Sequence, residues 1–158
     1  MKKPVSIGII VRSQKAYLPT RCFEERHKLY FSCEPVLVVD LIFDALVEAI
    51  RKKLEEGNPL IEVPNLQEFL KLKKAPPEAK AAGFRSWRSF VKKARAYGIN
   101  FLEDKIIVTM SGPSKGGWLV YDPKKTKEFP PDTPLEEVVR VIWEDIRSTP
   151  ELWEEDAP

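Results

Sequence analysis

The sequence is poor in the residues that build metal sites and disulfide frameworks, with one histidine and two cysteines. His27, Cys22 and Cys33 are too few for a structural zinc site, which takes four ligands, and no spacing of carboxylates completes the set. Two cysteines do not make a disulfide framework, so we expect reduced, partly buried thiols, with a single disulfide as the alternative. We therefore expect neither a metal nor a cofactor.

Long apolar runs are also absent. No stretch reaches the roughly 18 apolar residues that a membrane-spanning helix needs. The apolar run Val5–Val11 follows two lysines, as in a signal peptide, but Arg12 interrupts it and no small-residue cleavage site follows. We expect a cytoplasmic protein that does not contact a membrane.

Catalytic motifs are equally scarce. Cys22 precedes His27 by five residues, but the flanking pattern indicates strand or loop, which disfavours a catalytic dyad. The stretch SGPSKGG, residues 111–117, is glycine-rich and contains Lys115, but it lacks the Walker spacing and precedes an expected strand. We interpret it as a mobile loop. We expect a protein that is not an enzyme, although an enzyme built on a carboxylate pair would leave no motif to find.

The sequence does contain regular apolar periodicity over its 158 residues. Val5–Val11 alternates like a half-buried strand, and Pro19 would restrict the strand Lys15–Thr20 to an edge or a strand end. The stretches His27–Ser32 and Pro35–Asp40 are further strands, and the second is apolar enough for the centre of a sheet. The last strands are expected in an antiparallel meander, formed by Asn100–Met110 and Trp118–Asp122.

Helical periodicity separates these strands. Phe43–Leu54 should form a helix capped by Asp40 and ended by Gly57 and Pro59. Three further helices are expected. A short helix over residues 66–74 should begin with a capping box at Asn65 and Glu68, and a basic helix should run from Ser86 to Gly98. A C-terminal helix should begin at Thr133 as its N-cap and bury Leu135, Val139, Ile142 and Ile146. The pattern predicts a single α+β domain over residues 1–150, with an antiparallel sheet of about five to six strands against three to four helices. Residues 151–158 should form an acidic, flexible tail.

The basic helix raises the question of a binding site. Its apolar residues share one face, while Arg85, Arg88, Lys92 and Arg95 should share the other as a stripe of like charge, which is slightly unfavourable. The stripe has three candidate counterparts. The first is internal, since residues 71–97 hold nine bases and one acid, whereas residues 128–156 hold ten acids and two bases. The second is nucleic acid, whose phosphates the stripe could follow, and the third is an acidic protein surface.

Several phrases together resemble the small bacterial immunity proteins of contact-dependent growth inhibition systems. These phrases run in order along most of the chain and are LPT, EPVLVVD, GNPLIEVP, GFRSWRSF, GGWLVYDP and FPPDTPLEEVV. The resemblance implies a non-catalytic inhibitor that binds the toxin domain delivered by a neighbouring cell and covers its active site. It transfers no site residues to this chain, because the docking surfaces of such proteins differ with each toxin.

The resemblance and the charge pattern give two functional hypotheses. The first is an immunity protein that neutralises a cognate toxin domain, and the second is a small nucleic-acid-binding domain that uses the basic helix. Inhibitors of nucleic-acid-cleaving toxins are expected to present an acidic face, so either the acidic C-terminal region docks or the toxin surface is itself acidic. The predicted binding residues are Arg85, Arg88, Lys92, Arg95, Lys115 and Trp118.

Overall fold

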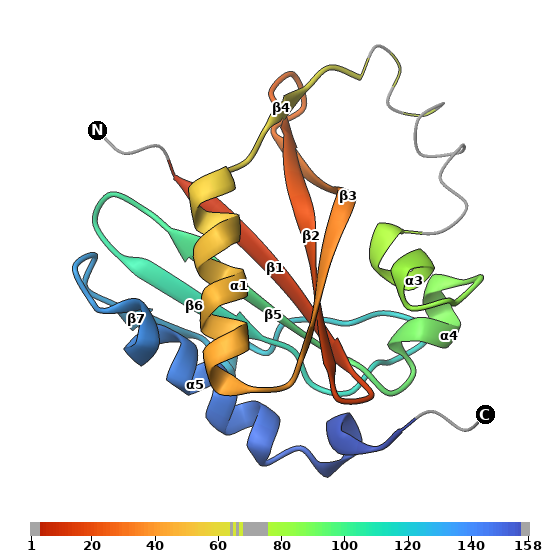
Figure 1. The fold of residues 1–158 in the computed structure, drawn as a ribbon. Helices are drawn as coiled ribbons and strands as arrows, with labels where there is room; N and C mark the ends of the chain where they lie inside the picture. The colour runs from red at the N-terminus through yellow and green to blue at the C-terminus, as the bar shows by residue number, and fades with distance from the viewer. Residues whose placement is uncertain (1–3, 64, 66, 68–75, 156–158) are drawn as a thin grey trace.

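An open, seven-stranded sheet forms the centre of the computed structural model, which describes residues 4–63, 65, 67 and 76–155 (Figure 1). The strands are β1 (Val5–Arg12), β2 (Lys15–Glu24), β3 (Leu29–Asp40), β4 (Leu60–Ile61), β5 (Arg95–Phe101), β6 (Ile106–Met110) and β7 (Lys127–Phe129). The helices are α1 (Phe43–Glu56), α3 (Pro77–Ala81), α4 (Trp87–Val91) and α5 (Leu135–Arg147), and two short 3-10 helices are η1 (Pro123–Lys125) and η2 (Pro150–Trp153).

The sheet order is β3-β2-β1-β5-β6-β7, with every neighbouring pair antiparallel, and β4 adds to β2 in parallel. Helices α1 and α5 pack on one face of this sheet and build the larger core with Ile9, Tyr97 and Val108. The smaller core lies on the other face, where Ile10 and Phe90 meet beneath α3 and α4. The predicted single α+β domain is therefore confirmed.

Strand β1 is buried more completely than its alternating pattern predicted. Ile7, Ile9 and Val11 enter the larger core, as expected, but Ile10 enters the smaller core on the opposite face. The half-buried assignment was wrong because β1 lies between β2 and β5 and helices cover both of its faces.

The two hairpin strands β2 and β3 also differ from prediction. Strand β2 continues through Pro19 to Glu24, and the pairing with β3 shifts register between Pro19 and Thr20. A proline is tolerated inside a paired strand at such an irregularity. The segments His27–Ser32 and Pro35–Asp40 belong mainly to one strand, β3, which lies at the edge of the sheet and not at its centre.

Helix α1 follows prediction except at its start. Gly57, at φ 73°, caps its C-terminus, as expected. Asp40 is not the N-cap, because Ile42 occupies that position and the Asp40 carboxylate instead pairs with Lys15 at 2.8 Å. The helix predicted over residues 66–74 lies outside the described residues.

Helix α5 buries Val138, Val139, Ile142 and Ile146, and Leu135 is half-buried beside them. Its N-cap position is Pro134, and the Thr133 hydroxyl donates to Pro130 instead of capping the helix.

The flexible tail expected from Glu151 does not begin at that residue. Residues 150–153 form η2, in which Leu152 is fully buried and its carbonyl accepts the N–H of Gln14 at 2.8 Å. Tail residues 156–158 lie outside the described part of the chain. In the part that the structure covers, the helices are too short or too polar to cross a bilayer.

Candidate functional site

Helix α4 is much shorter than the predicted basic helix. Ser86 is its N-cap, as expected, and the Ser86 hydroxyl accepts the N–H of Ser89 at 3.2 Å. The helix ends at Val91, however, and the chain enters β5 at Arg95, where it pairs with β1. The predicted helix to Gly98 was wrong because the apolar side chains of this segment can be buried in the core equally well when the segment forms a central strand.

This change divides the predicted basic stripe. The guanidinium of Arg95 is nearly buried in β5 and forms an ion pair with Glu151 at 3.1 Å. Lys93 also reaches the acidic C-terminal region, at 4.0 Å from Glu154. The internal-pairing alternative is therefore confirmed for Arg95 and Lys93.

The remaining three cations of the stripe, Arg85, Arg88 and Lys92, are exposed. Among the described residues, none of them has a carboxylate within 4.0 Å. Arg88 and Lys92 lie one helical turn apart, whereas Arg85 precedes the N-cap and is not part of the helix. The stripe is thus reduced to a pair of neighbouring cations.

Arg88 is brought against the glycine-rich stretch 111–117, which the sequence placed far from it. A β-carbon on Gly117 would lie 3.2 Å from the Cγ atom of Arg88, so the stem of this arginine covers the glycine backbone. The predicted mobile loop is instead a tight turn, with reciprocal backbone hydrogen bonds of 2.9 and 3.1 Å between Lys115 and Trp118. Gly116 and Gly117 both have positive φ, which this two-residue turn requires.

The turn presents an exposed apolar group beside the cations. Trp118 is 70% exposed and Val120 is 69% exposed, the highest values among the large hydrophobic side chains that the structure describes. A shallow groove of about 370 Å³ joins Trp118, Val120 and Tyr121 to Lys115. We call Arg88, Lys115, Trp118, Val120 and Tyr121 together the Trp118 surface.

The strand predicted over Trp118–Asp122 is not formed. Only isolated bridges pair Ser111 with Tyr121 and Lys115 with Trp118. Leu119 packs into the smaller core, while the Tyr121 hydroxyl lies over Gly98, where a β-carbon would be 3.1 Å from it. The segment therefore does alternate, with Leu119 partly buried and its neighbours Trp118 and Val120 exposed, but it lies outside any sheet.

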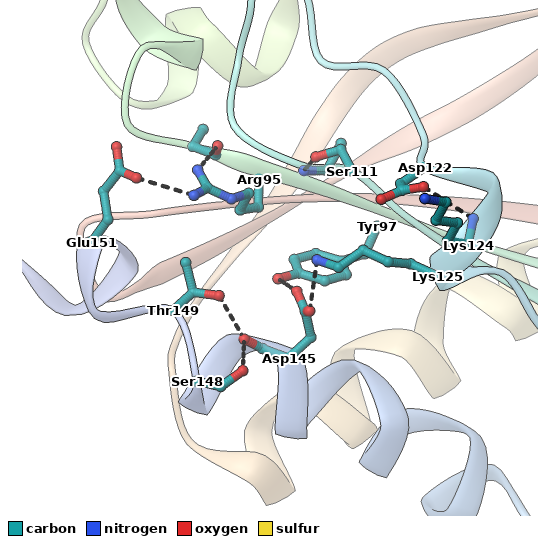
Figure 2. A network of polar contacts seen from close by, with 12 residues as sticks. Arg95, Tyr97, Ser111, Asp122, Lys124, Lys125, Asp145, Ser148, Thr149 and Glu151 are labelled. Atoms are coloured by element: carbon teal, nitrogen blue, oxygen red, sulfur yellow. Dashed lines mark hydrogen bonds and ion pairs between the residues drawn. The ribbon is translucent and has the colours of Figure 1, made fainter.

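A partly buried polar network surrounds the two ends of this segment (Figure 2). The Tyr97 hydroxyl donates to Asp145 at 2.7 Å, and the Lys125 ammonium meets the same carboxylate at 2.8 Å. Burial and, next, the hydrogen bond to Asp145 raise the pKa of Tyr97 well above its ordinary value. At the other end, the Ser111 hydroxyl accepts the N–H of Ala96 at 2.8 Å. These contacts tie β5 and α5 to Ser111 and Lys125, the residues on either side of the segment.

The side chain of Arg12 fixes helix α4 to the sheet, a role that the sequence did not predict. The Arg12 guanidinium, at the end of β1, donates to the carbonyls of Ser89 and Phe90 at 3.0 and 2.7 Å. It also lies 4.4 Å from the ring centroid of Phe84. Arg12 thus sets the position of α4 and, with it, that of Arg88.

The cysteines and the histidine lie in the β2–β3 hairpin, away from this network. Cys22 and Cys33 lie on neighbouring strands, and both are in the thiol form, as expected. The His27 ring contacts the Glu24 carboxylate, with Nδ1 at 2.7 Å from Oε2. Burial acts to raise the pKa of Glu24, but hydrogen bonds from the backbone and ring of His27 outweigh it and lower that pKa.

Comparison with known proteins gives similarity of fold only. No protein-family model and no curated protein matches the sequence. A Neisseria meningitidis structure described as a protein of unknown function, NMB0488, has a TM-score of 0.66 at 12% identity, covering 90% of this chain and 93% of that one. A chain of the "CdiA-CT/CdiI toxin and immunity complex from Yersinia pseudotuberculosis" has a TM-score of 0.59 at 11% identity, covering 96% and 98%.

Proposed function

We propose that this chain is a non-enzymatic immunity protein that binds and neutralises a cognate toxin domain of a contact-dependent growth inhibition system. The observation that carries the proposal is the similarity of fold, over 96% of this chain, to a chain of a toxin and immunity complex. The phrases that resemble such immunity proteins support the same function independently of the fold.

The Trp118 surface is the proposed docking site. Protein interfaces concentrate their binding energy in aromatic and arginine side chains, and here an exposed Trp118 lies near an Arg88 that lacks an acidic partner among the described residues. The reciprocal backbone hydrogen bonds between Lys115 and Trp118 already close the turn, so docking would order little additional structure there. Arg88 and Lys115 have no carboxylate within 4.0 Å in the described part of the chain, and cations around an apolar anchor favour a partner with acidic groups at its own surface.

The direct test is co-expression with the C-terminal domain of the protein that the neighbouring gene encodes, which the proposal expects to be the toxin domain. We expect a tight one-to-one complex and rescue of growth in cells that express the toxin domain. A chain that neither binds the domain nor rescues growth would contradict the proposal.

Nucleic acid remains the second candidate, because Trp118 and Tyr121 are exposed and could stack on bases, while Gly117, next to Trp118, lies against Arg88. A site made of Arg85, Arg88, Lys92 and Lys115 would neutralise about four phosphates, so log K should fall with log salt at a slope of about −3 to −4. Micromolar binding of RNA or DNA oligomers at about 150 mM salt, with no protein partner recovered, would favour this candidate over an immunity protein.

A further inference from the structure

The end of α1, the start of α5 and the β5–β6 turn lie on the same side of the molecule (Figure 1). Residues from all three line an apolar groove. Its volume is about 720 Å³, which is within the range of roughly 300–1,000 Å³ found for ligand pockets. Its lining residues are Val5, Leu54, Phe101, Leu102, Glu103, Ile106, Pro131, Asp132, Thr133 and Leu135. The groove belongs to the α1–α5 face of the sheet, whereas α4 and Leu119 pack on the opposite face.

At the groove, some side chains of the larger core are only partly covered by the protein. Ile106 is buried at 3% exposure, but Leu54, Phe101 and Leu135 are only half-covered. The side chains of Arg51 and Glu136 join α1 to α5 at 3.0 Å, just before Leu54 and just after Leu135. Apolar surface from several elements therefore meets in one hollow beside this ion pair.

The rim of the groove is acidic. Glu103 and Asp132 are exposed, and within the described ranges neither carboxylate has a cation within 4.0 Å. The neighbouring Lys105 does not supply one, because its ammonium pairs with Glu128 at 3.3 Å. A hollow with apolar walls and two carboxylates that lack a cation partner among the described residues favours an occupant that is apolar at its centre and cationic at its edges.

We infer that this groove binds a protein segment in which large aliphatic or aromatic side chains are flanked by lysine or arginine. The apolar side chains would cover Leu54, Leu102 and Leu135, and the flanking cations would pair with Glu103 and Asp132. The site is independent of the Trp118 surface and takes a partner surface of opposite charge.

The test uses three fluorescent peptides and the whole chain, with binding followed by anisotropy at about 150 mM salt. The probe is acetyl-KFLKRLK-amide, and the controls are acetyl-EFLEELE-amide, which reverses the charge, and acetyl-KSSKRSK-amide, which removes the apolar side chains. We expect the probe to bind at least about tenfold more tightly than either control. No binding of the probe, or equal binding of the probe and either control, would overturn the inference.

Matched variants locate the site. The double variant Glu103→Lys/Asp132→Lys, and separately Leu102→Ser, should each weaken probe binding at least about tenfold. The control Asp44→Lys/Glu144→Lys changes the net charge equally, but these residues lie about 15 Å and about 14 Å along α1 and α5 from Leu54 and Leu135. It should weaken binding less than about threefold. Equal losses in the two double variants, or none in the groove variants when circular dichroism shows them folded, would refute the site.

Discussion

Arg95 and Glu151 form an ion pair of 3.1 Å that joins the start of β5 to η2. The side chain of Arg95 is 10% exposed and that of Glu151 is 34% exposed, so solvent screens this pair less than it screens a surface pair. Arg95 therefore has a structural role. Arg88 has no carboxylate partner among the described residues and is available to bind a partner protein.

Arg95→Met should therefore lower the free energy of unfolding by about 1.5–3 kcal/mol, the range for a hydrogen bond to a charged group, because it leaves Glu151 without its partner. Arg88→Met is the matched control and should stay within about 0.5 kcal/mol of wild type, as for an exposed substitution. Urea unfolding measures both. Equal stability of the two variants would contradict the division of roles.

Trp118→Ala should weaken binding of the toxin domain by about 2 kcal/mol or more, which is about thirtyfold, as for a central aromatic anchor. Leu60→Ala is the control, since Leu60 is 64% exposed but lies in β4, beside β2. Calorimetry measures the two affinities. Unchanged affinity of the Trp118 variant in a complex that still forms would remove the Trp118 surface from the interface while leaving the proposed immunity function intact.

Ile142→Ala should destabilise the protein by about 2–5 kcal/mol, because Ile142 is fully buried between α5 and the sheet and its removal leaves a cavity. Glu144→Ala, two residues further along the same helix, changes an exposed side chain and should have a small effect. The difference in stability between the two variants is measured by their midpoints of denaturant unfolding, provided that the slope of free energy against denaturant concentration is the same in both.

Tyr97→Phe should cost about 1.5 kcal/mol at neutral pH, the lower end for a hydrogen bond to a charged group, since Lys125 still pairs with Asp145. The raised pKa of Tyr97 adds a pH signature. Its contribution is complete below the unfolded-state pKa of about 10 and is lost as pH rises above that value, because only the unfolded state then releases the phenolic proton. The stability gap between wild type and Tyr97→Phe should therefore narrow in alkaline solution, and a constant gap would contradict the assignment.

Glu24 should show the opposite dependence in acid. Its pKa is lowered in the folded state by the hydrogen bonds from His27, so its contribution is present above the ordinary carboxyl pKa of about 4.3 and is lost as pH falls through the lowered value. The stability gap between wild type and Glu24→Gln should shrink between neutral pH and about pH 3. Thermal unfolding across this range measures it, with Glu25→Gln, which is exposed, as the control.

Local chemistry in the sequence was sufficient for several elements. The periodicity of Phe43–Leu54 and of Leu135–Ile146 predicted α1 and α5, because an apolar stripe at helical spacing has one stable way to be buried. Ser86 predicted the start of α4 because a serine at that position satisfies a free N–H of the first turn. The Gly116-Gly117 pair also carried a readable turn signal, which the interpretation as a mobile loop missed.

The sequence by itself thus determined the α+β class, the two long helices and the presence of exposed cations near residue 88. Only the tertiary structure decided that residues 95–97 form a strand, because the apolar spacing suits either state and pairing with β1, more than eighty residues earlier in the chain, selects one. The tertiary structure also places Arg95 beside Glu151, and the turn at Gly116-Gly117 beside Arg88. The sequence did predict Arg88, Lys115 and Trp118 as binding residues, but they come from two separate segments, and only the tertiary structure decided that they share one surface.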